Sequence, residues 1–254
     1  MTDAKVAVVT GGGTGVGRAC ATQLARLGFA VQISGRRKDV LEETADAIHS
    51  EVPGSTVATR VADVSVPEDC EALIASAIEE LGGVHVLVTA AAFYEPVAFT
   101  DITAENWDAT MDTVLRGSVL PAAAATRWMK DHGGGRVVLI SSINGVVSEP
   151  ESAAYSAAKA AIISVARSIS MDLSESGVSA NALILGWTNT AMVEEFLETA
   201  TPESLKTLNM LGRVAEPAEI AGFVGYLATE APAYLTGAAL TIDGGQTALA
   251  PMPG

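Results

Sequence analysis

Short apolar runs alternate with helical patterns along this 254-residue chain, and this alternation restricts its fold more than any other feature. The runs are too short for helices and read as buried strands. Strands joined by helices pair in parallel, so one domain over residues 1–254 is predicted, with helices on both faces of a parallel sheet. We expect strands at 5–10, 30–34, 56–61, 84–89, 136–142, 178–183 and 239–242, helices at 18–27, 39–50, 67–81, 104–131, 152–176 and 216–228, and a helical, partly apolar insertion at 190–211.

Composition excludes several classes of partner. The net charge of −15 argues against nucleic acid and anionic membrane surfaces, and no stretch has the roughly 18 uninterrupted apolar residues of a membrane span. Only Cys20 and Cys70 are present, which indicates reduced thiols and a cytoplasmic setting. The three histidines, His49, His85 and His132, sit apart without metal-ligand spacing, so we expect no metal.

A glycine-rich turn stands between the first strand and the first helix. The strand 5–10 runs directly into GGGTGVG, whose glycines permit close backbone approach while the helix start offers N–H groups to a phosphate. The pattern TGxxxGxG fits this turn and the Rossmann GxGxxG does not. Dinucleotide binding is favoured over a plain tight turn, and the residues assigned to it are Gly11, Thr14, Gly15, Val16 and Gly17.

The end of the second strand indicates which dinucleotide is bound. An NAD site usually has an acidic residue there to hold the ribose 2′-hydroxyl, but this chain has Gly35 followed by Arg36, Arg37 and Lys38. Arginine binds phosphate in a bidentate manner, so NADP(H) is favoured over NAD(H). The alternative is a solvated basic turn before the next helix.

The segment 152–170 reads as one helix and contains a tyrosine and a lysine one turn apart, Tyr155 and Lys159. A phenol has a pKa of about 10, and a nearby ammonium lowers it, so the pair is a candidate for proton transfer. Ser142 ends the strand 136–142 and can offer its hydroxyl to an oxygen held near Tyr155. Taken alone, a tyrosine and a lysine at this spacing also occur by chance on helices that have no catalytic role.

Together these residues resemble the short-chain dehydrogenase/reductase family over nearly the whole chain. The resemblance implies a Rossmann-like fold, a doubly wound parallel α/β sheet in three layers, with hydride transfer between a nicotinamide and a carbonyl or alcohol. It also implies a homotetramer. The matching motifs are TGxxxGxG at 10–17, Asp63-Val64, Ser142, Tyr155-xxx-Lys159, Gly186 with Thr190, and Asp243-Gly244-Gly245.

The resemblance also implies roles for individual residues. Tyr155 would be the general acid/base, Lys159 would hold the nicotinamide ribose and lower the Tyr155 pKa, and Ser142 would position the substrate oxygen. Further cofactor contacts would be Arg36, Arg37, Asp63, Val64, Ala90, Ala91, Tyr155, Lys159, Gly186, Thr188 and Thr190. Substrate contacts would be Ser142, Asn144, Tyr155, Phe93, Trp187, Met192 and Phe196, with Tyr94, Ile143, Val147 and Met210 nearby.

Three positions depart from the family pattern. Thr89-Ala90-Ala91-Ala92 replaces Asn-Asn-Ala-Gly, Leu185 replaces the proline before Gly186, and Val114 stands where an asparagine usually helps to hold a relay water. Valine cannot form a hydrogen bond through its side chain. The proton relay behind Lys159 therefore uses backbone groups or another route, or activity is low.

The leading hypothesis is an NADP-dependent oxidoreductase acting on a neutral cyclic or aromatic ketone or the corresponding secondary alcohol. One alternative is a 3-oxoacyl-thioester reductase, although the predicted lid at 190–211 is acidic and weakly disfavours a polyanionic substrate. The alternative from another class is a non-catalytic NADP-binding sensor or scaffold. No nucleic acid, membrane or metal is expected as a partner.

Overall fold

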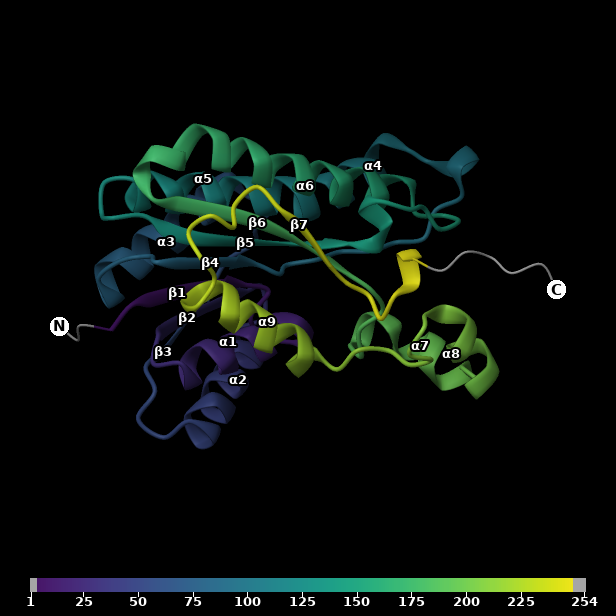
Figure 1. The fold of residues 1–254 in the computed structure, drawn as a ribbon, viewed down its shortest axis with the longest axis horizontal. Coiled ribbons are helices and arrows are strands. Elements are labelled where there is room, and N and C mark those ends of the chain that lie inside the picture. Colours follow the sequence, from purple (N-terminus) through teal and green to yellow (C-terminus); the bar gives the residue numbers. More distant parts are fainter. Residues whose placement is uncertain (1–3, 249–254) are drawn as a thin grey trace.

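Seven strands form one parallel sheet, as the alternating pattern predicts (Figure 1). The computed structural model describes residues 4–248. The order across the sheet is β3-β2-β1-β4-β5-β6-β7, which confirms the doubly wound Rossmann-like architecture. The strands are β1 (Val6–Thr10), β2 (Ala30–Gly35), β3 (Val57–Val61), β4 (Val86–Thr89), β5 (Gly135–Ser142), β6 (Val178–Leu185) and β7 (Ala239–Ile242).

The strand order reverses at β1, which pairs with β2 on one side and with β4 on the other. Thr10, the last residue of β1, pairs with Ser34 and with Thr89. In an open parallel sheet the connections leave on opposite faces at such a point, so a crevice forms beyond the carboxyl ends of the strands. The glycine-rich turn leaves β1 at this edge.

Helices α1 (Gly15–Arg26), α2 (Lys38–Glu51) and α9 (Pro217–Thr229) cover one face of the sheet, the lower one in Figure 1. Their apolar side chains meet the inward residues of the strands on that side. This core contains Ala7, Val9, Val31, Ile33, Leu24, Leu41, Ile48, Ile220 and Val224.

Helices α3 (Pro67–Leu81), α5 (Gly117–Met129) and α6 (Ala153–Leu173) cover the other face, where α5 and α6 lie above the sheet in Figure 1. Val8 points to this face while its neighbours in β1 point to the first, as the alternation of side chains along a strand requires. This second core contains Val8, Leu73, Leu87, Ala125, Met129, Val137, Leu139, Ile162 and Ala166. Among the helices within residues 4–248, none is long and apolar enough to span a membrane.

The predicted single helix over 104–131 is wrong in one respect, because a π-helical turn divides it. The segment forms α4 (Ala104–Thr110), a π turn (Met111–Arg116) and α5. Pro121 in α5 has no N–H group, so it cannot bond to the carbonyl of Gly117, four residues earlier. The π turn ends directly before Gly117. The π turn carries Val114, whose side chain is fully buried in the second core.

The predicted helical insertion 190–211 is divided as well. It contains α7 (Glu194–Thr199) and α8 (Pro202–Leu208), and the chain breaks between them because Thr201 and Ser204 cap α8 reciprocally. Figure 1 shows these two helices projecting beyond the sheet on the side of the described carboxyl end. Short 3₁₀ turns lie at Phe99–Asp101, Ile143–Gly145, Ser174–Ser176, Ala191–Val193 and Gln246–Ala248.

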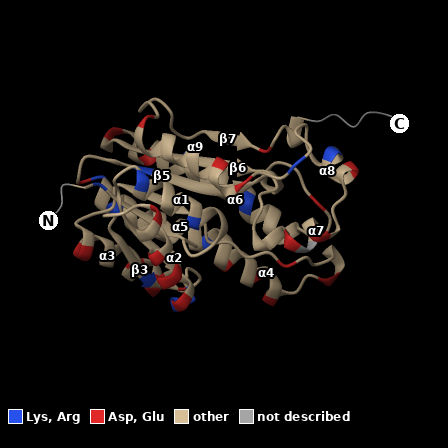
Figure 2. Cartoon of the chain, turned by 90° about the horizontal axis from the view of Figure 1, so that it is seen from below, with Lys and Arg blue, Asp and Glu red and all other residues tan. Residues whose placement is uncertain are grey.

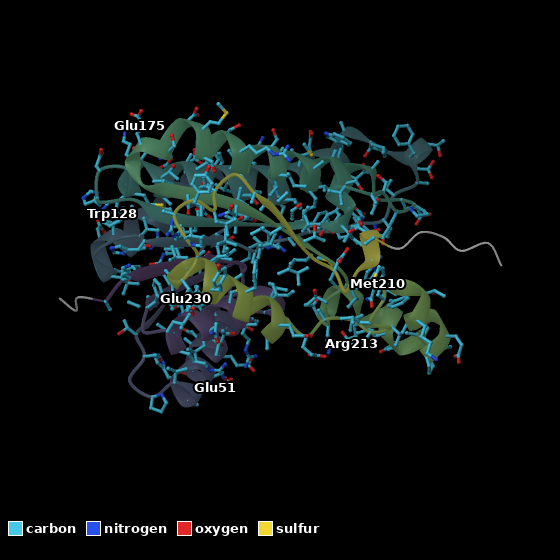
Figure 3. The ribbon with its side chains drawn as sticks, viewed as in Figure 1. Glu51, Trp128, Glu175, Met210, Arg213 and Glu230 are labelled. Carbon is cyan, nitrogen blue, oxygen red and sulfur yellow. The ribbon has the colours of Figure 1, made fainter. Side chains whose placement is uncertain are left out.

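Trp128 brings together two histidines that we expected to lie apart. Its ring meets His85 edge-on with centroids 5.2 Å apart, and it stacks on His132 at 4.2 Å. The cluster lies at the end of the molecule opposite Met210 (Figure 3). The backbone N–H of Val6 donates to Nδ1 of His85 at 2.9 Å, which fixes the neutral tautomer of that ring. Burial lowers the pKa of His85, and the charges of Lys5 and His132 act in the same direction.

We expect His85 to make part of the stability depend on pH. The unfolded histidine has a pKa of about 6.5 and the folded one a lower pKa, so the folded chain binds fewer protons. The contribution of His85 is therefore present above about pH 6.5 and is lost as the pH falls towards the folded pKa. In urea unfolding at about pH 7.5 and about pH 5.5, His85→Gln should lose less stability on acidification than the unmodified protein.

His49→Gln is the matched control, because this histidine is exposed on α2. It should keep the pH dependence of the unmodified protein. An identical acid response in the His85→Gln variant would contradict the role given to His85.

Candidate active site

A cavity of about 1180 Å³ opens at the carboxyl edge of the sheet, where the strand order reverses. It extends from the glycine-rich turn after β1 to the start of α6, and the segment around α7 forms part of its wall. All of the residues assigned above to catalysis, cofactor and substrate line it. Their individual roles stay predictions.

The glycine-rich turn is shaped by close backbone contacts. Gly11 has a φ of +64°, and a Cβ placed on it would lie 2.7 Å from the backbone nitrogen of Ala91. A Cβ on Gly17 would lie 2.2 Å from the carbonyl oxygen of Gly11. Helix α1 begins at Gly15 after Thr14, and no side chain caps its first turn. Its N–H groups are therefore available to an anion such as a pyrophosphate, and the turn fits a dinucleotide.

The three cations after β2 do not act together. Arg36 and Arg37 line the cavity and are exposed, whereas Lys38 lies outside its lining and pairs with Glu42, with Nζ and Oε1 3.4 Å apart. Helical geometry explains the difference, because Lys38 begins α2 and Glu42 lies one turn further along. Two arginines, and not three cations, thus face the cavity.

Asp63 lies beside these arginines on the wall of the cavity. Its Oδ1 accepts hydrogen bonds from the backbone N–H and the hydroxyl of Ser65, at 3.0 and 2.7 Å. Burial raises its pKa, but these hydrogen bonds and the charge of Arg36 outweigh that effect and keep the pKa of Asp63 below its ordinary value. Asp63 is therefore an ionised acceptor at neutral pH.

The end of β5 and the start of α6 bring Ser142, Tyr155 and Lys159 together. Tyr155 stands in the first turn of α6, and the Lys159 ammonium lies 5.4 Å from the centre of its ring. Nζ of Lys159 donates to the carbonyl oxygen of Ile140 at 2.8 Å. Ser142 Oγ accepts a hydrogen bond from the backbone N–H of Asn144 at 3.2 Å, so its own proton can be donated to another group.

Burial dominates the acid–base state of this pair in the protein alone. It raises the pKa of Tyr155 to about 12, against the opposing effect of a hydrogen bond with Ser142, and it lowers the pKa of Lys159 to about 8. The lowering of the Tyr155 pKa by Lys159 that we expected is therefore not found here. The Lys159 ammonium is bonded to the Ile140 carbonyl, and desolvation is the largest effect on the pKa of the Tyr155 phenol.

The far end of the cavity is mainly apolar and aromatic. Trp187 and Phe196 pack with ring centroids 4.5 Å apart, and Tyr94 meets Tyr155 edge-on at 5.2 Å. Phe93 and Met192 complete this wall. Such a lining suits an organic substrate with a hydrophobic body.

Two residues that we placed near this end do not line the cavity. Val147 is exposed on the loop before α6, and Met210 packs against Gly245, where a Cβ would come within 2.6 Å of its sulfur atom. Both were placed from the family resemblance, which does not report the direction of an individual side chain in a loop.

Sequence reasoning missed Glu149 and Thr113, which line the cavity. The only sequence signal for Glu149 is an acidic Glu-Pro-Glu run just before the helix of Tyr155. Thr113 precedes Val114 in the π turn, a conformation that we did not predict. Val114 itself offers only its backbone, and its carbonyl oxygen already accepts a hydrogen bond from the Ser118 hydroxyl at 2.8 Å.

Comparisons with known proteins find relatives that match nearly the whole chain. The family model described as Enoyl-(Acyl carrier protein) reductase matches residues 11–247. Dehydrogenase/reductase SDR family member 4 of Bos taurus is 32% identical over 247 residues, covering 96% of this chain and 87% of the relative. Cis-4-hydroxycyclohexanecarboxylate dehydrogenase of Sinomonas cyclohexanicum is 34% identical, covering 96% and 97%. The crystal structure of gox2181 superposes with a TM-score of 0.90 at 30% identity, covering 98% and 97%.

We expect Gly17→Ala to open the glycine-rich turn. The added methyl group would lie 2.2 Å from the Gly11 carbonyl oxygen, so the backbone must move. Thermal unfolding should show a loss of about 1–3 kcal/mol, the usual cost of overpacking. Titration with NADPH should show binding weakened at least about tenfold, because the phosphate-facing N–H groups shift with the turn.

Gly222→Ala on α9 is the control, since a Cβ there meets nothing within 4 Å. It should be neutral or stabilise by about 0.5–1 kcal/mol. Normal dinucleotide binding and stability in Gly17→Ala would refute the assigned geometry.

Proposed function

The chain belongs to the short-chain dehydrogenase/reductase family, and we propose that it is an NADP-dependent oxidoreductase that interconverts a ketone and a secondary alcohol. The observation that carries this proposal is the convergence of Ser142, Tyr155 and Lys159 in the cavity that also contains the glycine-rich turn. A protein that only bound the dinucleotide would have no use for this set of side chains.

Cofactor choice rests on the arginines at the end of β2. Arg36 and Arg37 face the cavity, and the residue before them is Gly35, so no carboxylate stands there to accept from a ribose 2′-hydroxyl. Two guanidinium groups suit a 2′-phosphate in both charge and geometry. When bound in this cavity, the nicotinamide supplies or accepts the hydride.

In the direction of reduction, Ser142 Oγ donates a hydrogen bond to the carbonyl oxygen and orients it. Tyr155 Oη gives its proton to that oxygen as the carbonyl carbon accepts the hydride, which leaves a secondary alcohol and a phenolate. The Lys159 ammonium would hold the nicotinamide ribose, as the resemblance implies, and the phenolate then recovers a proton from solvent. Oxidation of an alcohol reverses each step and begins with Tyr155 as the base.

The substrate class is proposed from the far end of the cavity. Trp187, Phe196, Phe93 and Met192 suit a cyclic or aromatic body. One similar protein is named for a dehydrogenase of a substituted cyclohexane, and others are named as 3-oxoacyl-[acyl-carrier-protein] and acetoacetyl-CoA reductases. The segment 190–211 would act as a lid. Its sequence has Glu194, Glu195, Glu198 and Glu203 against Lys206, so a large polyanionic thioester is the less favoured substrate.

We also propose a cytoplasmic homotetramer. Cys20 and Cys70 are both free and buried, which suits a reducing compartment. Met171 on α6 and Tyr234 before β7 expose most or all of their apolar side chains, 81% and 100%, as residues at subunit interfaces do in an isolated chain. Figure 2 shows Asp and Glu residues distributed over many elements of the chain, and such a distribution of negative charge disfavours binding to anionic surfaces.

Tyr155→Phe tests the proton step. Ketone reduction with NADPH should fall by about 10²–10⁴-fold, the usual contribution of general acid–base catalysis, while titration shows that NADPH still binds. In the unmodified enzyme, oxidation should rise with pH over the measurable range, because Tyr155 must lose its proton and its pKa is about 12. Tight NADPH binding without Tyr155-dependent turnover of cyclic and aromatic ketones would instead support a sensor or scaffold.

Arg36→Ala tests the cofactor assignment. Loss of a charge-assisted bidentate contact should weaken NADPH binding by about tenfold or more and change NADH binding by less than about threefold. Lys38→Ala is the matched control, because it removes a cation two residues away that pairs with Glu42 outside the cavity lining. Equal losses for NADPH and NADH in Arg36→Ala would remove the basis for NADP preference.

A further inference from the structure

Glu149 places a carboxylate at the substrate end of the cavity. Among the described residues, five charged side chains line the cavity. Arg36, Arg37 and Asp63 follow β2 and β3 at the dinucleotide end, and Lys159 is buried and bonded to a backbone carbonyl. Within the described lining, Glu149 is thus the single charge left to meet a substrate beside Tyr155.

The loop that carries Glu149 is held firmly before α6. The backbone carbonyl oxygen of Glu149 accepts a hydrogen bond from the Ser152 hydroxyl at 2.6 Å. The carbonyl oxygen of Glu151 accepts one from the backbone N–H of Val97 at 2.9 Å. Glu151 has a φ of +60°, the only positive φ of a non-glycine residue in the described chain. A non-glycine residue adopts this conformation at a cost that the surroundings must offset, and such residues concentrate at functional sites.

The carboxylate of Glu149 retains capacity to accept hydrogen bonds. Oε2 accepts one from the side-chain amide of Asn144 at 3.2 Å, and Asn144 is itself buried. Within residues 4–248, Oε1 has no hydrogen-bond donor. An ionised carboxylate accepts about four hydrogen bonds in all, so the pairing with Asn144 orients the group and leaves room for a ligand.

The charge of Glu149 also reaches the groups that handle the substrate. Burial is the main cause of the raised pKa values of Tyr155 and Tyr94, and the negative charge of Glu149 raises both further. A positive or hydrogen-bond-donating group on a ligand would offset this effect. The charge of Glu149 is therefore close enough to act on Tyr155 and Tyr94, whereas the charge of Glu151 acts on Tyr94.

We propose that Glu149 selects carbonyl substrates carrying a hydrogen-bond donor, a hydroxyl or an ammonium, and discriminates against those carrying a carboxylate. This assignment rests on the proposed function. An ionised carboxylate only accepts hydrogen bonds, so a donor facing it forms a charge-assisted bond, whereas a second carboxylate meets repulsion in a site of reduced dielectric constant. With the aromatic lining of the same cavity, the substrate class becomes a cyclic ketone with one polar donor substituent.

A matched series of ketones tests the assignment. The probes are cyclohexanone, 4-hydroxycyclohexanone, 4-aminocyclohexanone in its ammonium form and 4-oxocyclohexanecarboxylate, each reduced with saturating NADPH at about pH 7. We expect kcat/KM for the hydroxyl and ammonium ketones to exceed that for the carboxylate by at least about tenfold. Glu149→Gln should bring the ratios among the four ketones to within about threefold, and any change in the Tyr155 proton step affects all four ketones alike and leaves these ratios unaffected.

Glu151→Gln is the control, because it removes the same charge from the same loop at a residue that does not line the cavity. It should keep the ratios of the unmodified enzyme. The assignment is overturned if the carboxylate ketone is reduced as well as the others, if Glu149→Gln leaves the ratios unchanged, or if Glu151→Gln shifts them equally. Failure to reduce any of the four ketones despite NADPH binding would instead overturn the proposed function, and this assignment with it.

Discussion

The contacts between the end of β5 and the first turns of α6 are the constraint on which the site depends. The Ser141 hydroxyl donates to the Lys159 carbonyl at 2.8 Å, and the Lys159 ammonium donates to the Ile140 carbonyl at 2.8 Å. Gly145 comes so close that a Cβ would lie 2.9 Å from the Lys159 backbone. Both the backbone and the side chain of Lys159 are thus bonded to the end of β5. These two bonds fix the start of α6, and with it Tyr155, relative to Ser142. The price is a desolvated ammonium and a phenol whose pKa lies far above neutrality.

Most of the fold could be predicted because it follows from local patterns. Strand β7 and helix α3 have the expected bounds, and the glycine-rich turn lies where a phosphate-binding turn should. Side chains whose direction is set by helix or strand geometry, such as Tyr155 and Lys159, also lie together as expected. These features depend on residues near one another in sequence, and spacing captures them.

Features that depend on distant packing were missed. The π turn at Met111–Arg116 is a compromise between Pro121 and the packing of Gly117 against Val64, a residue far away in sequence. The contact of His85 with Trp128 arises where the start of β4 meets the end of α5. Glu149, Val147 and Met210 lie in irregular segments, where neither a period of two nor one of 3.6 tells which way a side chain points.

The π turn has a consequence for how this segment tolerates insertions and deletions. A π turn is an α-helical turn that contains one additional residue, so its phase differs by roughly 100° from that of an uninterrupted helix. Deleting one residue between Met111 and Arg116 would restore regular helical phase. It would also rotate α4 by roughly 100° relative to α5, so that Thr110, the buried residue of α4, would leave its present position. A point substitution in this segment changes the contacts of one side chain. The deletion of a single residue changes the direction of every side chain of α4 relative to α5.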